Sequence, residues 1–239
     1  MCEFRSDAET TSAAEFSSGS ARIWCRILFA EQFDALRRSC GCNESFIESL
    51  SRCVKWDSSG GKSGAAFLKT RDDRFILKQL SRSEADSFSK FAPHYFDYMA
   101  NCFYRDRPTT LAKILGYFRI GFKNPHTGRT LKFDCLVMEH LFYGRTMKQI
   151  FDLKGSMRNR LVQTHGNANQ DEVQVLQDEN LVELAQSNPL FVREHSKRLI
   201  RAALWNDSLF LADMNVMDYS LVVGIDKNKP ELVVGIIGK

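Results

Sequence analysis

The order of hydrophobic and polar residues along the chain predicts a mixture of strands and helices. Runs rich in β-branched and aromatic residues predict strands over residues 22–29, 65–70, 74–80, 113–123, 130–138, 219–225 and 231–237. Helical periodicity and helix start and stop residues predict helices over residues 30–40, 43–52, 83–103 and 189–213. Turn residues between neighbouring strands favour hairpins. The pattern therefore predicts an α+β fold whose first 140 residues form a mainly antiparallel sheet.

The helix predicted over residues 83–103 has a specific start signal. Ser81 and Glu84 have the spacing of a capping box, and apolar residues follow at three- and four-residue steps up to Met99. Pro93 is expected to bend this helix. We expect its apolar stripe to cover one face of the sheet.

Three segments follow from the same pattern. Residues 1–20 are rich in Ser, Ala, Thr and Glu without a sustained period, and are predicted to be disordered. Residues 21–142 hold the predicted sheet, and residues 143–239 hold the remaining elements. Within the last segment, the polar residues 163–177 are predicted to be a surface loop.

The positive charge is local. The formal net charge is +4, and five of the six charged residues between Arg145 and Arg160 are basic, so the rest of the chain is balanced. This distribution indicates a localised anionic partner and argues against a nucleic-acid binder. No run of about 18 apolar residues occurs, so any membrane contact is expected to be peripheral.

The cysteines favour a reduced environment. There are seven, an odd number, and the first twenty residues do not have the pattern of a secretion signal. We therefore expect a reduced, cytoplasmic protein. Cys40 and Cys42 lack the spacing of a zinc site, so we assign no metal ligands and interpret them as free thiols.

Two features suggest phosphate binding. Gly60, Gly61 and Gly64 surround Lys62 and can expose backbone N–H groups to a phosphate. A strand follows this segment, which excludes a Walker A loop and leaves a kinase-type loop or an ordinary turn. Lys78 lies on the next strand among apolar residues, where it either meets an anion or keeps an edge strand soluble.

A carboxylate partner for Lys78 and a catalytic carboxylate are harder to assign. Glu84 and Asp97 are candidates for the partner, but the capping box already explains Glu84. Asp218 stands just before a strand, where it either orients an attacking hydroxyl or caps a turn. No His-Arg-Asp triplet precedes it, so an ordinary protein kinase is not expected.

Four short motifs together resemble the phosphatidylinositol phosphate kinases. They are Gly-Gly-Lys-Ser-Gly at 60–64, Arg-Phe-Ile-Leu-Lys at 74–78, Phe-Asp-Leu-Lys-Gly-Ser at 151–156 and Met-Asp-Tyr-Ser-Leu at 217–221. The segments at 91–96, 111–116 and 231–237 resemble the PIKfyve-type phosphatidylinositol 3-phosphate 5-kinases. The resemblance extends over residues 23–237 and implies a two-lobed fold with a nucleotide-binding first lobe and an incomplete second lobe.

The resemblance implies a role for each candidate. Gly60, Gly61, Lys62 and Gly64 would cover the phosphates of ATP, and Lys78 would hold the α- and β-phosphates. The hinge at 137–141, including Glu139 and Leu141, would meet adenine through its backbone. Asp218 would serve the inositol 5-hydroxyl, and Lys154 would face the phosphates or the headgroup. The membrane-binding candidates are Arg145, Lys148, Arg158 and Arg160, each worth about 1 kcal/mol near an anionic leaflet.

One departure affects the expected activity. The family continues after Ile237 with an Asp that binds Mg2+, whereas this chain has Gly238. Because the metal stabilises the transferring phosphoryl group, we expect little or no activity from the chain as given. The expected assignment is an ATP- and Mg2+-dependent lipid kinase, peripheral on endosomal membranes and open to scaffold partners. The alternative is a truncated, non-catalytic module that binds a phosphoinositide or a protein partner.

Overall fold

The computed structural model describes residues 12–18, 21–56, 66–163 and 173–238, which form two compact units. Within these ranges, the first unit comprises the residues up to Asp106 together with Lys113–His140. The second comprises Arg107–Ala112 and the residues from Leu141 onwards. The sequence placed the boundary after residue 142 and did not predict that residues 107–112 belong to the second unit.

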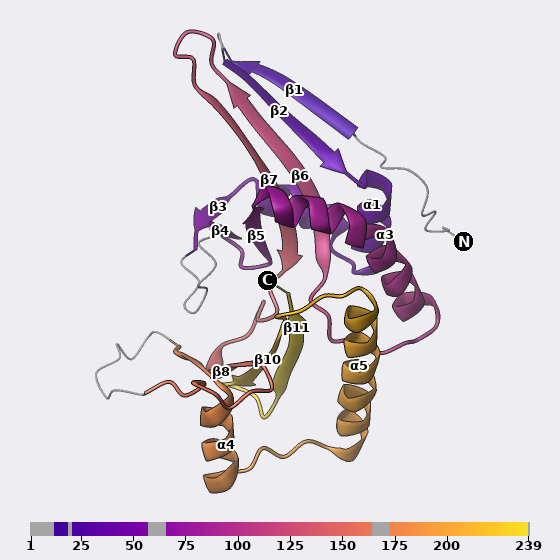
Figure 1. Ribbon diagram of the computed structural model, residues 1–239, viewed down its shortest axis with the longest axis vertical. Coiled ribbons are helices and arrows are strands. Elements are labelled where there is room, and N and C mark those ends of the chain that lie inside the picture. Colours follow the sequence, from indigo (N-terminus) through magenta and orange to yellow (C-terminus); the bar gives the residue numbers. More distant parts are fainter. Residues whose placement is uncertain (1–11, 19–20, 57–65, 164–172, 239) are drawn as a thin grey trace. The chain divides into compact units, whose positions relative to one another are not determined.

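The first unit is built on a seven-stranded sheet with the order β1-β2-β6-β7-β5-β4-β3 (Figure 1). Its strands are β1 (Ser12–Ser18), β2 (Ala21–Leu28), β3 (Cys53–Lys55), β4 (Phe67–Thr70), β5 (Phe75–Leu80), β6 (Ile114–Lys123) and β7 (Thr130–Glu139). Every neighbouring pair is antiparallel, which confirms the predicted sheet type. The sequence predicted disorder through residue 20, but Ser12–Ser18 pair along their whole length with β2.

Three helices accompany this sheet: α1 (Ala30–Ser39), α2 (Asn43–Leu50) and α3 (Arg82–Tyr104). The capping box of α3 is present, since Ser81 Oγ accepts from the Glu84 N–H and the Glu84 carboxylate accepts from the Ser81 N–H. The helix continues through Pro93 and buries the predicted stripe against the sheet. There the ring of Phe88 meets that of Tyr117 on β6 edge to face at 5.3 Å. The predicted cap of α2 differs, because Asn43 is its first residue and Cys42 precedes it.

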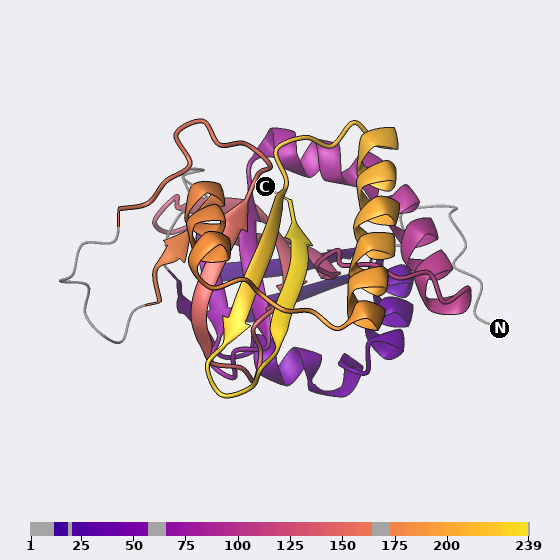
Figure 2. The same ribbon diagram turned by 90° about the horizontal axis from the view of Figure 1, so that it is seen from below.

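The second unit holds a four-stranded sheet with the order β11-β10-β8-β9. Its strands are β8 (Met147–Leu153), β9 (Val175–Leu176), β10 (Ser220–Asp226) and β11 (Leu232–Ile237). β10 pairs antiparallel with both β8 and β11, and β9 adds parallel to β8. The helices α4 (Asp178–Ser187) and α5 (Glu194–Asp213) lie on either side of β10 and β11 (Figure 2).

Three of these elements, β8, β9 and α4, were not predicted, and β9 lies within residues 163–177, which were predicted to be a surface loop. The sequence treated the region around Lys148 as a basic segment, but in β8 the polar Lys148 is exposed and the apolar Met147 and Phe151 are buried. The residues before α4 are polar, so the start of this helix was not apparent from the sequence. In the structure, the start is fixed by the Asn180 side chain, which accepts from the Gln177 backbone N–H. Tertiary contacts therefore determine the structure of β8 and α4 more than local propensity does.

The segment Arg107–Ala112 is anchored inside the second unit by a buried carboxylate. Asp207 of α5 is fully buried and accepts from the Thr110 backbone N–H and from the hydroxyls of Thr109 and Thr110, at 2.6 to 2.7 Å. The same segment exchanges backbone hydrogen bonds with Ile236 of β11. This short segment therefore lies beside β11 and is tied to α5.

Candidate functional site

A buried ion pair marks the first unit. Lys78 lies on β5, between β4 and β7, so it does not belong to an edge strand and that reading of it was wrong. It is 5% exposed, and its Nζ lies 2.7 Å from Oε1 of Glu84. Because an unpaired buried ammonium is costly, Glu84 provides the anion that this position needs.

Glu84 performs two tasks that the sequence treated as exclusive. Its Oε2 accepts from the backbone N–H and the hydroxyl of Ser81, while Oε1 accepts from Lys78. Partial burial raises the pKa of this carboxyl, but the hydrogen bonds from Lys78 and Ser81 outweigh it and lower the pKa to about 2. A carboxylate with two oxygens can serve both the helix cap and the lysine, which is why the capping box did not exclude the pairing.

The predicted hinge residues lie at the end of β7 and just beyond it. The Glu139 carboxylate accepts from the backbone N–H and the ammonium of Lys113 at 2.8 and 2.9 Å. The backbone N–H of His140 donates to the Arg74 carbonyl at 2.9 Å. In the second unit, Leu141 packs on Gly235, where an added Cβ would lie 2.6 Å from Leu141 Cδ1. Glu139 and Leu141 are therefore each held by neighbours within their own unit.

The second unit brings the two predicted catalytic residues together. Lys154 follows β8, and its Nζ donates to Oδ1 of Asp218 at 2.7 Å and to the Asp218 carbonyl at 2.8 Å. The Asp218 side chain is 59% exposed, whereas that of Lys154 is 19% exposed. Asp218 has a φ of +62°, a left-handed conformation that is uncommon for residues other than glycine. The result is an accessible carboxylate fixed from one side by a half-buried ammonium.

The sequence did not identify a third residue of this group. Asp178, at the start of α4, is 7% exposed and accepts from the backbone N–H groups of Lys154 and Gly155 at 3.0 and 2.8 Å. It also accepts from Nε of Arg160 at 2.8 Å. No motif marked Asp178, although an acidic residue at a helix start is a recognisable anchor for nearby backbone donors.

The four predicted membrane-binding residues differ in their surroundings. Arg160 is ion-paired with Asp178 and also contacts Asp152. Arg145 lies 3.6 Å from a carboxylate oxygen of Asp226 and also donates to the Glu231 carboxylate at 2.5 Å. Lys148 and Arg158 are exposed. The two arginines that have internal carboxylate partners contribute less to an external electrostatic surface than the sequence count suggested.

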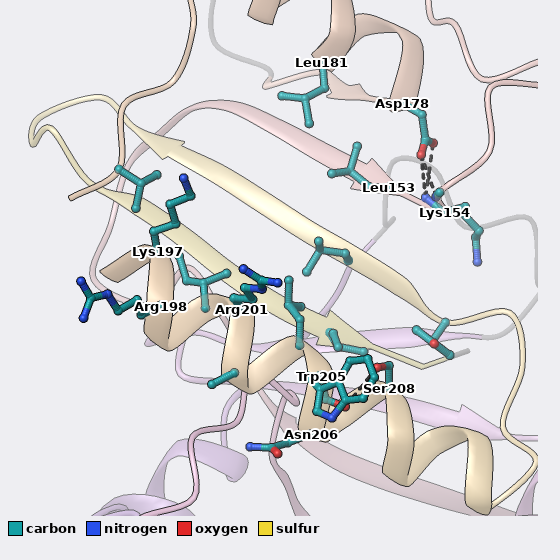
Figure 3. Close-up of a pocket in the computed structure, with 18 of the residues that line it drawn as sticks. Leu153, Lys154, Asp178, Leu181, Lys197, Arg198, Arg201, Trp205, Asn206 and Ser208 are labelled. Atoms are coloured by element: carbon teal, nitrogen blue, oxygen red, sulfur yellow. Dashed lines mark hydrogen bonds between the residues drawn. The ribbon is translucent and has the colours of Figure 1, made fainter. Parts of the chain in front are cut away.

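A cavity of about 1390 Å3 lies in the second unit between α5, α4 and the sheet (Figure 3). Its walls are mainly apolar and include Leu153, Leu181 and Trp205, the last 71% exposed. Lys197, Arg198 and Arg201 follow α5 along the same cavity, and Lys154 and Asp178 lie at another part of its wall.

The loop residues Gly60, Gly61, Lys62 and Gly64 lie outside the described residues. In the described part of the chain, no group of three or more His, Cys, Asp or Glu side chains could hold a metal ion, so these residues do not fit a protein-held metal centre. The described cysteines form no disulfide bonds. No described helix is long and apolar enough to cross a membrane.

Comparison with known proteins places these residues in context. A profile of the family described as Phosphatidylinositol-4-phosphate 5-Kinase matches residues 49–233. The chain is 55% identical over 224 residues to a 1-phosphatidylinositol 3-phosphate 5-kinase of Saccharomyces cerevisiae, covering 93% of this chain and 10% of that protein. It is 51% identical over 225 residues to the enzyme of that name from Homo sapiens, covering 93% and 11%. An Arabidopsis thaliana protein named as a 1-phosphatidylinositol-3-phosphate 5-kinase is 47% identical over 220 residues, covering 92% and 12%. The chain thus spans about a tenth of the length of these relatives.

Proposed function

Because the chain belongs to the phosphatidylinositol-4-phosphate 5-kinase family, we propose that it is the catalytic region of an ATP-dependent kinase for the 5-hydroxyl of phosphatidylinositol 3-phosphate. Relatives that carry this activity in their names are about half identical to it over nearly the whole chain. The observation that carries the proposal is the ion pair between Lys154 and Asp218 in the second unit.

Asp218 is the residue that acts on the substrate hydroxyl in this proposal. An exposed carboxylate can accept the hydrogen bond of an attacking hydroxyl and orient its oxygen toward the phosphoryl group. Lys154 holds one carboxylate oxygen at 2.7 Å and so limits the rotation of the side chain. The left-handed backbone at residue 218 is consistent with strain retained at a reacting residue.

Lys78 is the nucleotide-binding residue of the first unit. An ammonium has three N–H donors, and the bond to Glu84 uses one of them. The others suit the α- and β-phosphates of ATP, as in other kinases with a strand lysine. Glu84 keeps the ammonium in a fixed position when no phosphate is bound, which lowers the cost of binding one. Gly60, Gly61, Lys62 and Gly64 remain proposed phosphate contacts, and the backbones of Glu139 and Leu141 remain proposed adenine contacts.

In this proposal, Mg2+ is bound only together with ATP. Such an ion would neutralise part of the charge that develops on the phosphoryl group during transfer. The described residues do not assemble a metal centre of their own. No step of the proposed reaction therefore uses a metal bound by the described residues.

Membrane contact is proposed at the exposed cations. Lys148 and Arg158 remain candidates for an anionic leaflet, each worth about 1 kcal/mol near its surface. Arg145 and Arg160 take a smaller part in this proposal because their carboxylate partners compete with lipid phosphates. From the lipid substrate we further propose an endosomal location and binding to scaffold proteins.

The proposal is tested by transfer of radiolabelled phosphate from ATP–Mg2+ to vesicles that contain phosphatidylinositol 3-phosphate. Gly238 stands where an Asp is expected, and a Cβ there would meet nothing within 4 Å, so Gly238→Asp is accommodated without a clash. We expect little transfer by the chain itself, more by Gly238→Asp, and none above background when Asp218→Asn is added. Asp213→Asn, an exposed change at the end of α5, should leave transfer unaffected.

The alternative function is a non-catalytic module that binds a phosphoinositide or a protein partner. Gly238 is the observation that favours it, because glycine cannot replace a metal-binding carboxylate. Equal background from every variant, with each protein folded and bound to the vesicles, would support this alternative and contradict the proposed enzyme.

A further inference from the structure

The loop that carries Lys154 is held by its backbone. The N–H groups of Lys154 and Gly155 both point to the Asp178 carboxylate, at 3.0 and 2.8 Å from Oδ1 (Figure 3). Gly155 has a φ of +70°, which turns the chain sharply after Lys154. Two adjacent donors on one carboxylate fix the direction in which the Lys154 side chain leaves the loop.

The same carboxylate is held from its other side by Arg160. The Nε of Arg160 donates to Oδ2 of Asp178 at 2.8 Å, and its terminal nitrogen donates to the carbonyl of Asp152 on β8. The Arg160 side chain is 16% exposed. The start of α4, the end of β8 and the segment at residue 160 are thus joined at one point.

The position of Asp178 favours its ionised form. Partial burial raises the pKa of this carboxyl, but hydrogen bonds from Arg160, Lys154 and Gly155 outweigh that effect and lower the pKa. Asp178 is also the first residue of α4, where the helix dipole favours a negative charge. A charged acceptor binds backbone N–H groups more strongly than a neutral one.

We infer that Asp178 is a positioning residue for the reaction, which holds the Lys154 loop so that the ammonium of Lys154 meets Asp218. This inference rests on the proposed function for its kinetic consequence and on the hydrogen bonds alone for its structural one. Asp178 acts through Lys154, since its hydrogen bonds come from the backbone N–H groups of Lys154 and Gly155 and from Arg160. Without its charge, the loop keeps at most a neutral amide oxygen as its common acceptor, which binds the two N–H groups more weakly, and Arg160 faces a group that no longer balances it.

The first test follows the loop by NMR and needs no enzymatic activity. In Asp178→Asn, we expect the Gly155 amide to exchange with solvent at least tenfold faster, and the Lys154 side-chain ammonium signal to broaden beyond detection. Amides of Val222 and Val223 on β10 should keep their protection, which separates loop release from global unfolding. Glu179→Gln removes the neighbouring charge of α4 and should change neither signal.

The second test measures transfer kinetics in the Gly238→Asp background. Asp178→Asn should lower kcat about tenfold or more and leave the KM for ATP unchanged, because Lys78 lies in the other unit. A protected Gly155 amide with an intact Lys154 signal in Asp178→Asn would overturn the inference, as would a loss of kcat equal to that of Glu179→Gln. Absence of transfer in every variant would contradict the proposed function, and the NMR result would still decide the role of Asp178.

Discussion

Lys78 and Lys154 are both lysines paired with a carboxylate at 2.7 Å, yet the pairs differ in exposure. Lys78 is buried and its partner Glu84 is only partly exposed, which suits a cation that binds a multivalent anion. Lys154 supports an exposed Asp218, which suits a carboxylate that must reach a substrate. At the residue scale, the proposed functional residue of the first pair is therefore its buried member, Lys78, and that of the second pair is its exposed member, Asp218.

The low pKa of Glu84 predicts a pH-dependent contribution to stability. Its pKa of about 2 lies below the ordinary value of 4.5, so its stabilisation is complete above pH 4.5 and is lost as the pH falls toward 2. Because the side chain is 35% exposed, we discount the full effect to about 1 to 2 kcal/mol. Urea unfolding of wild type and Glu84→Gln should differ by this amount at pH 6 and converge near pH 2.

A control separates this effect from general acid sensitivity. Glu48→Gln removes an exposed carboxylate of α2 in the same unit. Its difference from wild type should stay near zero at both pH values. A Glu84→Gln difference that does not change between pH 6 and pH 2 would contradict the assigned pair.

At the element scale, a buried carboxylate ties a helix to a strand-like segment. Asp207→Ala would leave the Thr110 backbone N–H without its buried acceptor. We expect a loss of about 3 kcal/mol in the free energy of unfolding. Asp213→Ala, an exposed change on the same helix, should cost less than 0.5 kcal/mol, on the order of other surface substitutions. Equal midpoints of urea unfolding for both variants would contradict the anchor.

The elements differ in how far the sequence predicted them. The helix α3 and the hairpin of β4 and β5 were predictable because the capping box, the apolar stripe and the turn residues act locally. The strand β8 and the helix α4 were not, because each mixes polar with apolar residues and its structure depends on partners distant in sequence. Asp178 illustrates the limit, since its importance arises from backbone N–H groups more than twenty residues earlier.

The residues of the candidate site that belong to a recognisable motif were predictable from the sequence. Lys154 and Asp218 were assigned from two short motifs, and the structure brings them together. The pairing of Lys78 with Glu84 was left open, because one glutamate was assumed to perform one task. Arg145 and Arg160 were counted as external cations, because a sequence does not show that carboxylates such as Asp226 and Asp178 lie beside them.

At the scale of the whole molecule, each of the two units contributes a different set of the proposed functional residues. The first supplies Lys78 and Glu84, and the second supplies Lys154, Asp218 and the loop anchored by Asp178. The large apolar cavity, with Trp205 on its wall, also belongs to the second unit. A kinase needs both a phosphate-binding cation and a residue that orients the hydroxyl, and in the proposed function Lys78 and Asp218 take these two roles.

The central claim is that this chain binds ATP through Lys78. Isothermal titration of ATP–Mg2+ into the folded chain tests it most directly, with Lys78→Met as the variant and Lys69→Met as the control. Lys69 is also an ion-paired strand lysine of the first unit, bound to Asp73 at 2.7 Å. We predict measurable binding by wild type and Lys69→Met, and an affinity at least tenfold lower for Lys78→Met. Equal affinities in all three proteins, or no binding by the folded wild type, would contradict the account.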